Sequence, residues 1–186
     1  MKVVNLEDIK HGIRVANYSK EIAKLLDLSD KKIKEIYFSG LFHDIGKAYL
    51  NQNILNKPSM LSTIEKTEIS QHPMFSYEEV LKSGYSKEVA FNVLYHHENW
   101  DGSGYPKGIK KNSIPVGARI LKIADVFDAL TTSRPYRKKL SFDETLNIME
   151  NERTTYDPEL YYIFTNYIIK KYKENGNFNI NEIQNI

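Results

Sequence analysis

The sequence predicts a single all-helical domain, a helical bundle of about seven helices. Apolar residues recur about every three to four positions along most of the chain, which places them on one face of a helix. Residues that cap or break helices stand between these stretches, and no stretch alternates like a half-buried strand. A chain of 186 residues can bury the core of one domain and is short for two.

The first two helices are predicted from apolar spacing and from one cap. Residues 4–28 carry apolar side chains at helical spacing. Ser29 and Asp30 then indicate a helix start, because short polar side chains accept hydrogen bonds from the first free amides. Gly46 is expected to end this second helix. Residues 51–58, rich in Asn and with a closing proline, are expected to form a loop.

The middle of the chain carries clear start and stop signals. Ser62 and Glu65 have the spacing of a capping box, which predicts the start of a third helix. Pro73 should kink or break it, because proline lacks an amide hydrogen and its ring clashes with the preceding turn. Gly84 suits the end of a helix, and Ser86 suits the start of the next one.

The second half repeats this pattern after a shaped loop. Residues 99–106 contain two glycines and a proline and are expected to form that loop. Further helix starts are predicted at a proline or at capping residues, namely Pro115, Ser141 with Glu144, and Asp157 with Pro158. The domain is expected to cover residues 1–173, with residues 174–186 as a flexible Asn-rich tail.

The composition excludes several classes of protein. Lys and Arg total 26 against 24 Asp and Glu, so the net charge of +2 gives no general attraction to nucleic acid or anionic membranes. Cys is absent, which excludes disulfides, thiolate metal sites and cysteine nucleophiles. No apolar run approaches the roughly 20 residues that span a bilayer, and the first residues lack the core of a signal peptide. We expect a cytoplasmic protein that binds neither nucleic acid nor membrane.

The five histidines are not scattered. Each has a polar or proline neighbour in the chain or one helical turn away: His43 with Asp44, His96 with His97, His72 with Pro73, and His11 with Glu7. Asp125 and Asp128 are also spaced to share one helix face. Imidazoles and carboxylates on several helices are the ingredients of a multinuclear metal site in a bundle.

The residue types limit which metal such a site would take. Oxygen and imidazole ligands without thiolate favour Fe, Mn, Co or Ni, and allow Zn. Asp44 is suited to bridge two ions, because a carboxylate has two oxygens. The alternative from spacing alone is five unrelated histidines in the core or on the surface.

Four longer motifs stand out in the chain: HDIGK from His43, HHENWDGSGYP from His96, ARILKIADVFDAL from Ala118 and RPYR from Arg134. These motifs resemble those of the HD-GYP family, a branch of the HD-domain phosphohydrolases. The resemblance runs in order from about Glu7 to Phe164. One departure is the stretch from Asn151 to Pro158, where Tyr156 replaces a Phe and the family's Gly is missing; this removes no ligand.

The resemblance implies an HD-type helical bundle with a metal centre. The positions that match the family's ligands are His11, His43, Asp44, His72, His96, His97 and Asp125. Glu7 matches a glutamate that holds a third metal in some members. The chain is therefore expected to bind two or three divalent ions, Fe or Mn before Co, Ni or Zn. If wild type holds three, Glu7→Ala or Glu7→Gln should lower the number to two.

The resemblance also implies an activity, hydrolysis of the bacterial second messenger cyclic di-GMP to pGpG, which members of the family often cut further to GMP. Metal-activated hydroxide would attack the phosphodiester, with Asp44 and Lys47 in catalytic roles. Asp128 is expected to pair with Lys47 and hold it in place. The residues matched to substrate binding are Gly104, Tyr105, Pro106, Arg134 and Arg137.

Two other functions stay open at this point. The chain could be a receptor or adaptor for a cyclic dinucleotide with little turnover, although such members usually lack ligands and this chain lacks none. It could also hydrolyse another cyclic dinucleotide, such as cyclic GMP–AMP. Other signalling proteins that contact the GYP loop, and a homodimer, are the remaining partners considered.

Overall fold

The computed structural model describes residues 6–133 and 138–175. Within these ranges it contains nine α-helices, three 3-10 turns and no strand, so the prediction of an all-helical domain is confirmed. The α-helices are α1 (Leu6–Leu25), α2 (Asp30–Phe42), α3 (Gln52–Leu55), α4 (Thr63–Ile69), α5 (His72–Lys82), α6 (Lys87–Leu94), α7 (Val116–Thr131), α8 (Phe142–Asn151) and α9 (Pro158–Asn175). The 3-10 turns are η1 (Ile45–Tyr49), η2 (Lys111–Ser113) and η3 (Arg153–Thr155).

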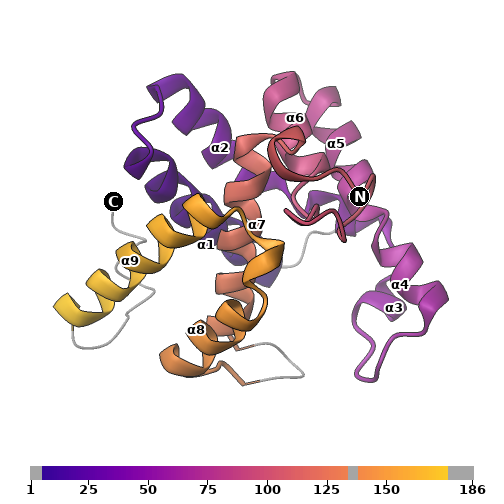
Figure 1. Ribbon diagram of the computed structural model, residues 1–186. Helices are drawn as coiled ribbons and strands as arrows, with labels where there is room; N and C mark the ends of the chain where they lie inside the picture. The colour runs from indigo at the N-terminus through magenta and orange to yellow at the C-terminus, as the bar shows by residue number, and fades with distance from the viewer. Residues whose placement is uncertain (1–5, 134–137, 176–186) are drawn as a thin grey trace.

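Helix α7 runs through the middle of the bundle, with α1 and α2 on one side and α5 and α6 on the other (Figure 1). A first apolar core joins α1, α2, α7, α8 and α9 around buried residues such as Ile22, Phe127 and Phe164. A second, smaller core packs α5 and α6 against α2, through Val80, Val93 and the partly buried Phe38. Because α7 borders the elements on both sides, its polar residues face the seam between them.

Several predicted helix boundaries are confirmed by their hydrogen bonds. Both capping boxes form, at Ser62 with Glu65 and at Ser141 with Glu144. Ser86 accepts a hydrogen bond from the amide of Val89. Gly84 has a φ of +80° just beyond α5. There its amide and that of the next residue bond back to carbonyls of the last turn, as in a Schellman motif.

Other boundaries differ from the prediction. Gly46 does not end α2, which stops at Phe42; it lies inside η1. A Cβ atom there would sit 2.2 Å from the carbonyl oxygen of His72, so the glycine allows η1 to touch the start of α5. Residues 51–58 are not wholly a loop, because the Asn51 side chain caps the short helix α3. Pro73 breaks the chain as predicted and stands in the first turn of α5.

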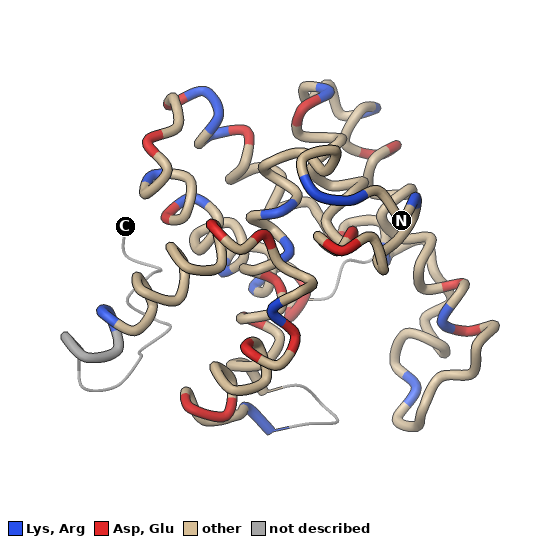
Figure 2. Tube along the Cα trace, in the orientation of Figure 1, with Lys and Arg blue, Asp and Glu red and all other residues tan. Residues whose placement is uncertain are grey.

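Charged residues of both signs are interspersed along the trace rather than separated into one basic and one acidic face (Figure 2). In the described part of the chain, no helix is both long enough and apolar enough to cross a bilayer. The predicted tail at 174–186 lies mostly outside the described residues.

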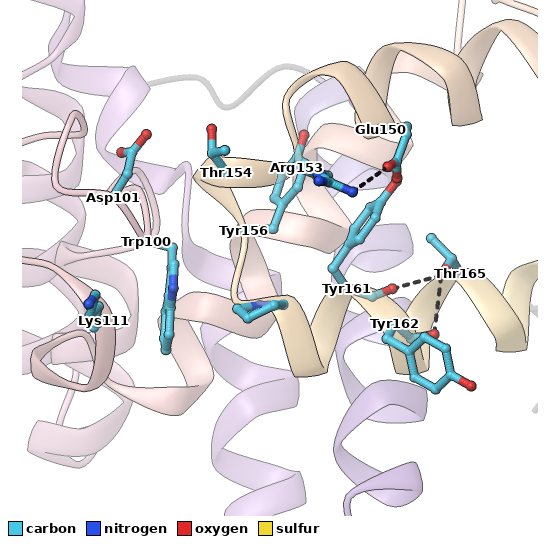
Figure 3. A pocket seen from close by; sticks show the side chains of 11 residues that line it. Trp100, Asp101, Lys111, Glu150, Arg153, Thr154, Tyr156, Tyr161, Tyr162 and Thr165 are labelled. Carbon is cyan, nitrogen blue, oxygen red and sulfur yellow. Dashed lines mark hydrogen bonds and ion pairs between the residues drawn. The ribbon is translucent and has the colours of Figure 1, made fainter.

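A hollow of about 690 Å³ lies between the loop after α6 and the elements α8, η3 and α9 (Figure 3). Trp100 lines it on one side, and Tyr161 and Tyr162 line it on the other. No histidine is among its lining residues, so this hollow is separate from the cluster described next.

Candidate metal centre

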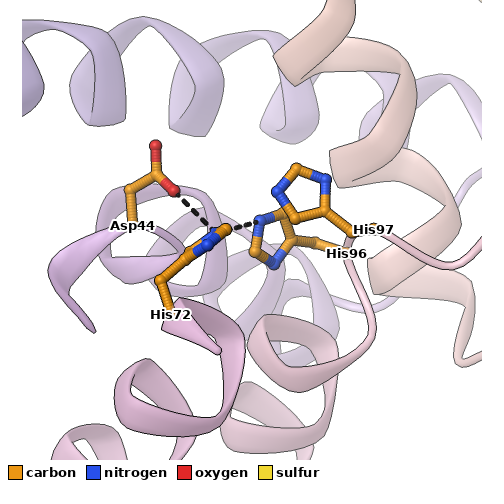
Figure 4. A group of neighbouring side chains, drawn as sticks. All are labelled: Asp44, His72, His96 and His97. Carbon is orange, nitrogen blue, oxygen red and sulfur yellow. Dashed lines mark hydrogen bonds and ion pairs between the residues drawn. The ribbon is translucent and has the colours of Figure 1, made fainter. Parts of the chain in front are cut away.

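Histidine and aspartate side chains from distant parts of the chain converge in the interior. Their nitrogen and oxygen atoms form two groups, and within each group these atoms lie within 4.8 Å of one another. The first group is Asp44, His72, His96 and His97, and the second is His11, His43 and Asp125 (Figure 4 shows the first). Together they contain every histidine of the chain. The alternative of unrelated histidines is therefore wrong.

Asp44 stands between the two groups. It follows α2 directly and is buried. One carboxylate oxygen, Oδ1, is 3.2 Å from Nε2 of His72 in the first group. The other, Oδ2, is 3.2 Å from Nε2 of His43 and 3.6 Å from Nε2 of His11 in the second. This arrangement fits the bridging role predicted for Asp44, with one oxygen for each ion.

Helix ends position three of the histidines. The ring Nδ1 of each lies beside a backbone carbonyl oxygen: His43 beside Gly40 at 2.7 Å, His72 beside Ile69 at 2.8 Å, and His96 beside Val93 at 2.6 Å. A carbonyl can only accept, so Nδ1 carries a hydrogen, and in the neutral imidazole the free lone pair is then on Nε2, which faces the cluster. The last four carbonyls of a helix have no partner within it, which makes helix ends suitable for this purpose.

The interior of the cluster contains polar atoms that a cation would satisfy. Nε2 of His11, Nε2 of His43 and Oδ1 of Asp44 are buried and make no hydrogen bond. Buried polar atoms in native proteins are almost always paired. Nitrogen and oxygen lone pairs that point at one another are the donor set of a divalent transition metal. The residues present therefore fit a metal centre.

The charges of the cluster also favour a cation. Burial favours the neutral form of Asp44, but the His43 imidazole and the Lys47 ammonium outweigh it and hold the pKa of that carboxyl well below its usual value. Burial likewise opposes ionisation of Asp125, and its pairing with the His11 ring, at 3.1 Å between Oδ1 and Nε2, outweighs this effect, so the pKa of Asp125 is also well below the usual range. Both carboxylates are ionised at neutral pH.

The adjacent histidines are held in the neutral form. Burial, and then the neighbouring His97, lower the pKa of His96 well below its ordinary value. Burial and the nearby His72 lower the pKa of His97 to about 3. Neutral imidazole is the form that binds metal, so these two rings do not need to lose a proton first.

The structure corrects the predicted partner of Asp128. Its carboxylate accepts hydrogen bonds from Nδ1 of His11 at 2.7 Å and from Nε of Arg14 at 2.6 Å, and it does not contact Lys47. Lys47 lies in η1 and points its ammonium at Asp44, with 2.5 Å between Nζ and Oδ2. Asp128 and Lys47 do not pair because they face different elements. Asp128 faces His11 and Arg14 on α1, whereas Lys47 lies one turn after Asp44 and faces that carboxylate.

The loop that follows α6 folds back over its own start. Glu98 is buried and accepts a hydrogen bond from the amide of Lys107 at 2.6 Å, which closes the loop. The amide of Tyr105 donates to the carbonyl of His97, and the two rings lie 4.8 Å apart. Tyr105 and its neighbours Gly104 and Pro106 are therefore held beside a predicted metal ligand.

Gly104 allows this close crossing, and we expect Gly104→Ala to disrupt it. A Cβ atom would lie 2.3 Å from the amide nitrogen of Asn99 and 2.4 Å from the carbonyl oxygen of His97. We expect the free energy of unfolding to fall by about 1–3 kcal/mol, as for other overpacked sites. Metal affinity should fall too, because His97 must move. Denaturant unfolding and metal titration measure both. Exposed Ser113→Ala should change stability by less than about 0.5 kcal/mol, and equal effects would contradict the prediction.

Three predicted site residues are not placed in the cluster. The Glu7 carboxylate pairs with Lys10 at 2.9 Å, is mostly exposed and belongs to neither group, so its role as a third-metal ligand stays a prediction. Arg134 and Arg137 lie outside the described residues.

Sequence reasoning assigned no role to Arg14. Its side chain is buried and forms a two-point contact with Asp128. Its spacing of three residues from His11 was the available signal, because it places both on one face of α1.

Comparison with known proteins identifies the class. The HD domain family matches residues 5–160. The chain therefore belongs to the HD-domain family, as the resemblance of its motifs implied. It is 39% identical over 161 residues to 3′3′-cGAMP-specific phosphodiesterase 1 of Vibrio cholerae, covering 82% of this chain and 37% of that protein. It is 35% identical over 162 residues to a cyclic di-GMP phosphodiesterase of Thermotoga maritima, covering 84% and 43%.

Solved structures share the fold. A cyclic GMP–AMP-specific phosphodiesterase of V. cholerae superposes with a TM-score of 0.71 at 21% identity, covering 95% of this chain and 48% of the other. An HDG"Y"P protein of Bdellovibrio bacteriovorus gives a TM-score of 0.70 at 21% identity, covering 89% and 54%. At these identities the likeness concerns the fold alone. The chain spans less than half the length of the two relatives compared by sequence.

Proposed function

We propose that this chain is a metal-dependent phosphodiesterase that hydrolyses cyclic di-GMP to pGpG and onward to GMP. The observation that carries the proposal is Asp44, which places one carboxylate oxygen in each of two buried ligand groups. A pair of adjacent cations is suited to phosphodiester hydrolysis, because the substrate is anionic at the bond to be cut. The relatives named as cyclic dinucleotide phosphodiesterases support this class of substrate.

Each group of residues has a part in the proposed reaction. The first group would hold one ion and the second group the other, with Fe or Mn favoured by the nitrogen and oxygen donors. When bound, such ions neutralise phosphate charge and lower the pKa of water. Lys47 would bind the phosphoryl oxygens, because its ammonium lies 2.5 Å from the Asp44 carboxylate, beside the proposed ions. Asp44 would hold both ions at a fixed spacing.

Five residues are proposed to bind the dinucleotide, and the loop that carries three of them lies beside His97 of the proposed metal centre. The Tyr105 ring is tilted against that of His97, with 4.8 Å between ring centroids, and would contact the sugar or base next to the bound phosphate. Arg134 and Arg137 would bind the second phosphate or a guanine edge, because a guanidinium has donors for either. Gly104 and Pro106 would shape the loop that holds Tyr105.

Cyclic GMP–AMP is the second candidate substrate. The observation that favours it is the 39% identity to the 3′3′-cGAMP-specific enzyme, against 35% to the cyclic di-GMP enzyme. Both cyclic dinucleotides have the same ring of two phosphodiesters, so the metal centre alone does not distinguish the two substrates.

The test is turnover by protein purified without oxygen and loaded with Fe or Mn. Cyclic di-GMP and cyclic GMP–AMP are supplied separately, and products are separated by chromatography. We expect pGpG from the first, faster than linear product from the second, and none after chelation. Binding of cyclic di-GMP without turnover by metal-loaded protein would favour the receptor alternative. Faster cleavage of cyclic GMP–AMP would favour the second substrate.

We expect Arg134→Ala and Arg137→Ala to raise KM by about tenfold or more each, since a lost charged hydrogen bond costs about 1.5–3 kcal/mol. Their metal content should match wild type, because neither is a proposed ligand. Steady-state kinetics and metal analysis measure the two effects. Loss of metal in either variant would contradict the placement of these residues at the substrate.

A further inference from the structure

His11 differs from the other ligands in how its ring is held. Three of the other histidines donate Nδ1–H to a carbonyl at the end of a helix. His11 lies in the second turn of α1, where carbonyls already accept from amides of the next turn. A local backbone acceptor is thus lacking at this position, and the ring needs an acceptor from another element.

Helix α7 supplies that acceptor through Asp128. Oδ2 of Asp128 lies 2.7 Å from Nδ1 of His11 and 3.0 Å from the Nη2 atom of Arg14, while Oδ1 accepts from Nε of Arg14 at 2.6 Å. All three side chains are buried. A carboxylate fixed by a guanidinium can only accept, so Nδ1 of His11 carries the hydrogen and Nε2 faces the cluster.

The arrangement consists of two helix-spaced pairs that interlock. His11 and Arg14 are three residues apart on α1, and Asp125 and Asp128 are three apart on α7. The inner pair joins Nε2 of His11 to Oδ1 of Asp125 at 3.1 Å, inside the second ligand group. The outer pair joins Arg14 to Asp128. The outer pair therefore sets the angle at which the inner pair meets.

We propose that Arg14 and Asp128 are positioning residues that aim Nε2 of His11 at the second metal site. The inference rests on the proposed metal centre and adds that one ion depends on this pair while the other does not. Residues Asp44, His72, His96 and His97 receive no contact from Arg14 or Asp128 in the structure, so the first group should keep its ion without them.

The test is Asp128→Asn, measured by metal titration against a competing chelator. Asn keeps the shape but has one acceptor oxygen for two donors, so either His11 or Arg14 meets an amide NH₂. We expect one of the two ions to bind about 10–100-fold more weakly, as for other residues that orient a metal-bound histidine. The affinity of the other ion should stay at its wild-type value.

A second variant separates positioning from packing. Arg14→Met combined with Asp128→Leu replaces a buried ion pair by apolar side chains, a change that often preserves stability. If the pair were only structural, this variant would recover both folding and metal affinity. We expect it to fold and still to bind one ion weakly, because His11 has no acceptor.

The matched control is Asp157→Asn. Asp157 forms a partly buried ion pair with Arg119 of α7, at 2.5 Å, and belongs to neither ligand group. The Asp157→Asn variant should have a lower thermal stability than wild type, with unchanged affinity for each of the two ions. Equal metal affinities in wild type, Asp128→Asn and the double variant would overturn the inference. Weakening of both ions alike would also overturn it. A wild type that binds no divalent ion would instead overturn the proposed function.

Discussion

Asp44→Ala is expected to lose bound metal and turnover together while its helical circular dichroism stays unchanged. The Asp44 carboxylate reaches histidines of both groups, with oxygens 3.2 Å from His72 and 3.2 Å from His43. Its removal leaves each group short of a charged ligand at once. The loss of activity should exceed the roughly 10–100-fold effect of changing a residue that only supports a ligand.

Metal analysis after anaerobic loading, followed by turnover of cyclic di-GMP, measures both effects. The control is Asp143→Ala, which removes an exposed carboxylate from α8. It should keep full metal content and wild-type turnover. Normal metal content in Asp44→Ala would sink the assignment of this cluster as the metal centre.

Lys47→Ala is expected to keep its metal and lose rate. The Lys47 ammonium lies 2.5 Å from the carboxylate of Asp44, and removing a positive charge beside a cation site does not weaken cation binding. If the ammonium stabilises charge on the phosphoryl oxygens, kcat should fall about 10²–10³-fold, equivalent to about 3–4 kcal/mol.

The matched control is Lys57→Ala. Lys57 pairs with Glu65 at 2.7 Å between α3 and α4 and serves as an ordinary ion-paired lysine. It should leave kcat unchanged. An unchanged rate in Lys47→Ala, measured at saturating substrate, would make Lys47 a structural lysine. A loss of metal would show that it supports Asp44 instead of the substrate.

The sequence was sufficient for the helices because their ends carry local chemistry. The boxes at Ser62 and Ser141 depend only on residues three positions apart, so spacing alone predicts them. The prediction that Gly46 ends α2 was wrong because the role of this glycine is not local. Gly46 is needed because the start of α5 touches η1 at this position. The sequence alone does not distinguish a glycine that ends a helix from one that allows close contact with another element.

The same distinction applies to the site. The convergence of the five histidines with Asp44 and Asp125 could be predicted because the HD-GYP motifs specify the order of these residues in the chain. The hydrogen-bond partners of Asp128 could not be predicted from the sequence. Spacing places Asp128 on the face of Asp125, but whether that face meets Lys47 or Arg14 depends on how α7 packs against α1. Contacts between elements are set by tertiary packing, which local patterns do not encode.

The carbonyls that hold His43, His72 and His96 have a consequence for how such a chain can diverge. For these three ligands the orienting group is the backbone, which every amino acid supplies. Substitutions on the outer faces of α2, α4 and α6 can therefore accumulate without rotating an imidazole, as long as each helix ends at the same residue. Sequence change around His11 is more constrained, because a substitution of Asp128 or Arg14 must be matched by a substitution of the other. We therefore expect substitutions to be frequent and independent on the outer faces of α2, α4 and α6. Where α1 packs against α7, we expect them to occur as coupled pairs.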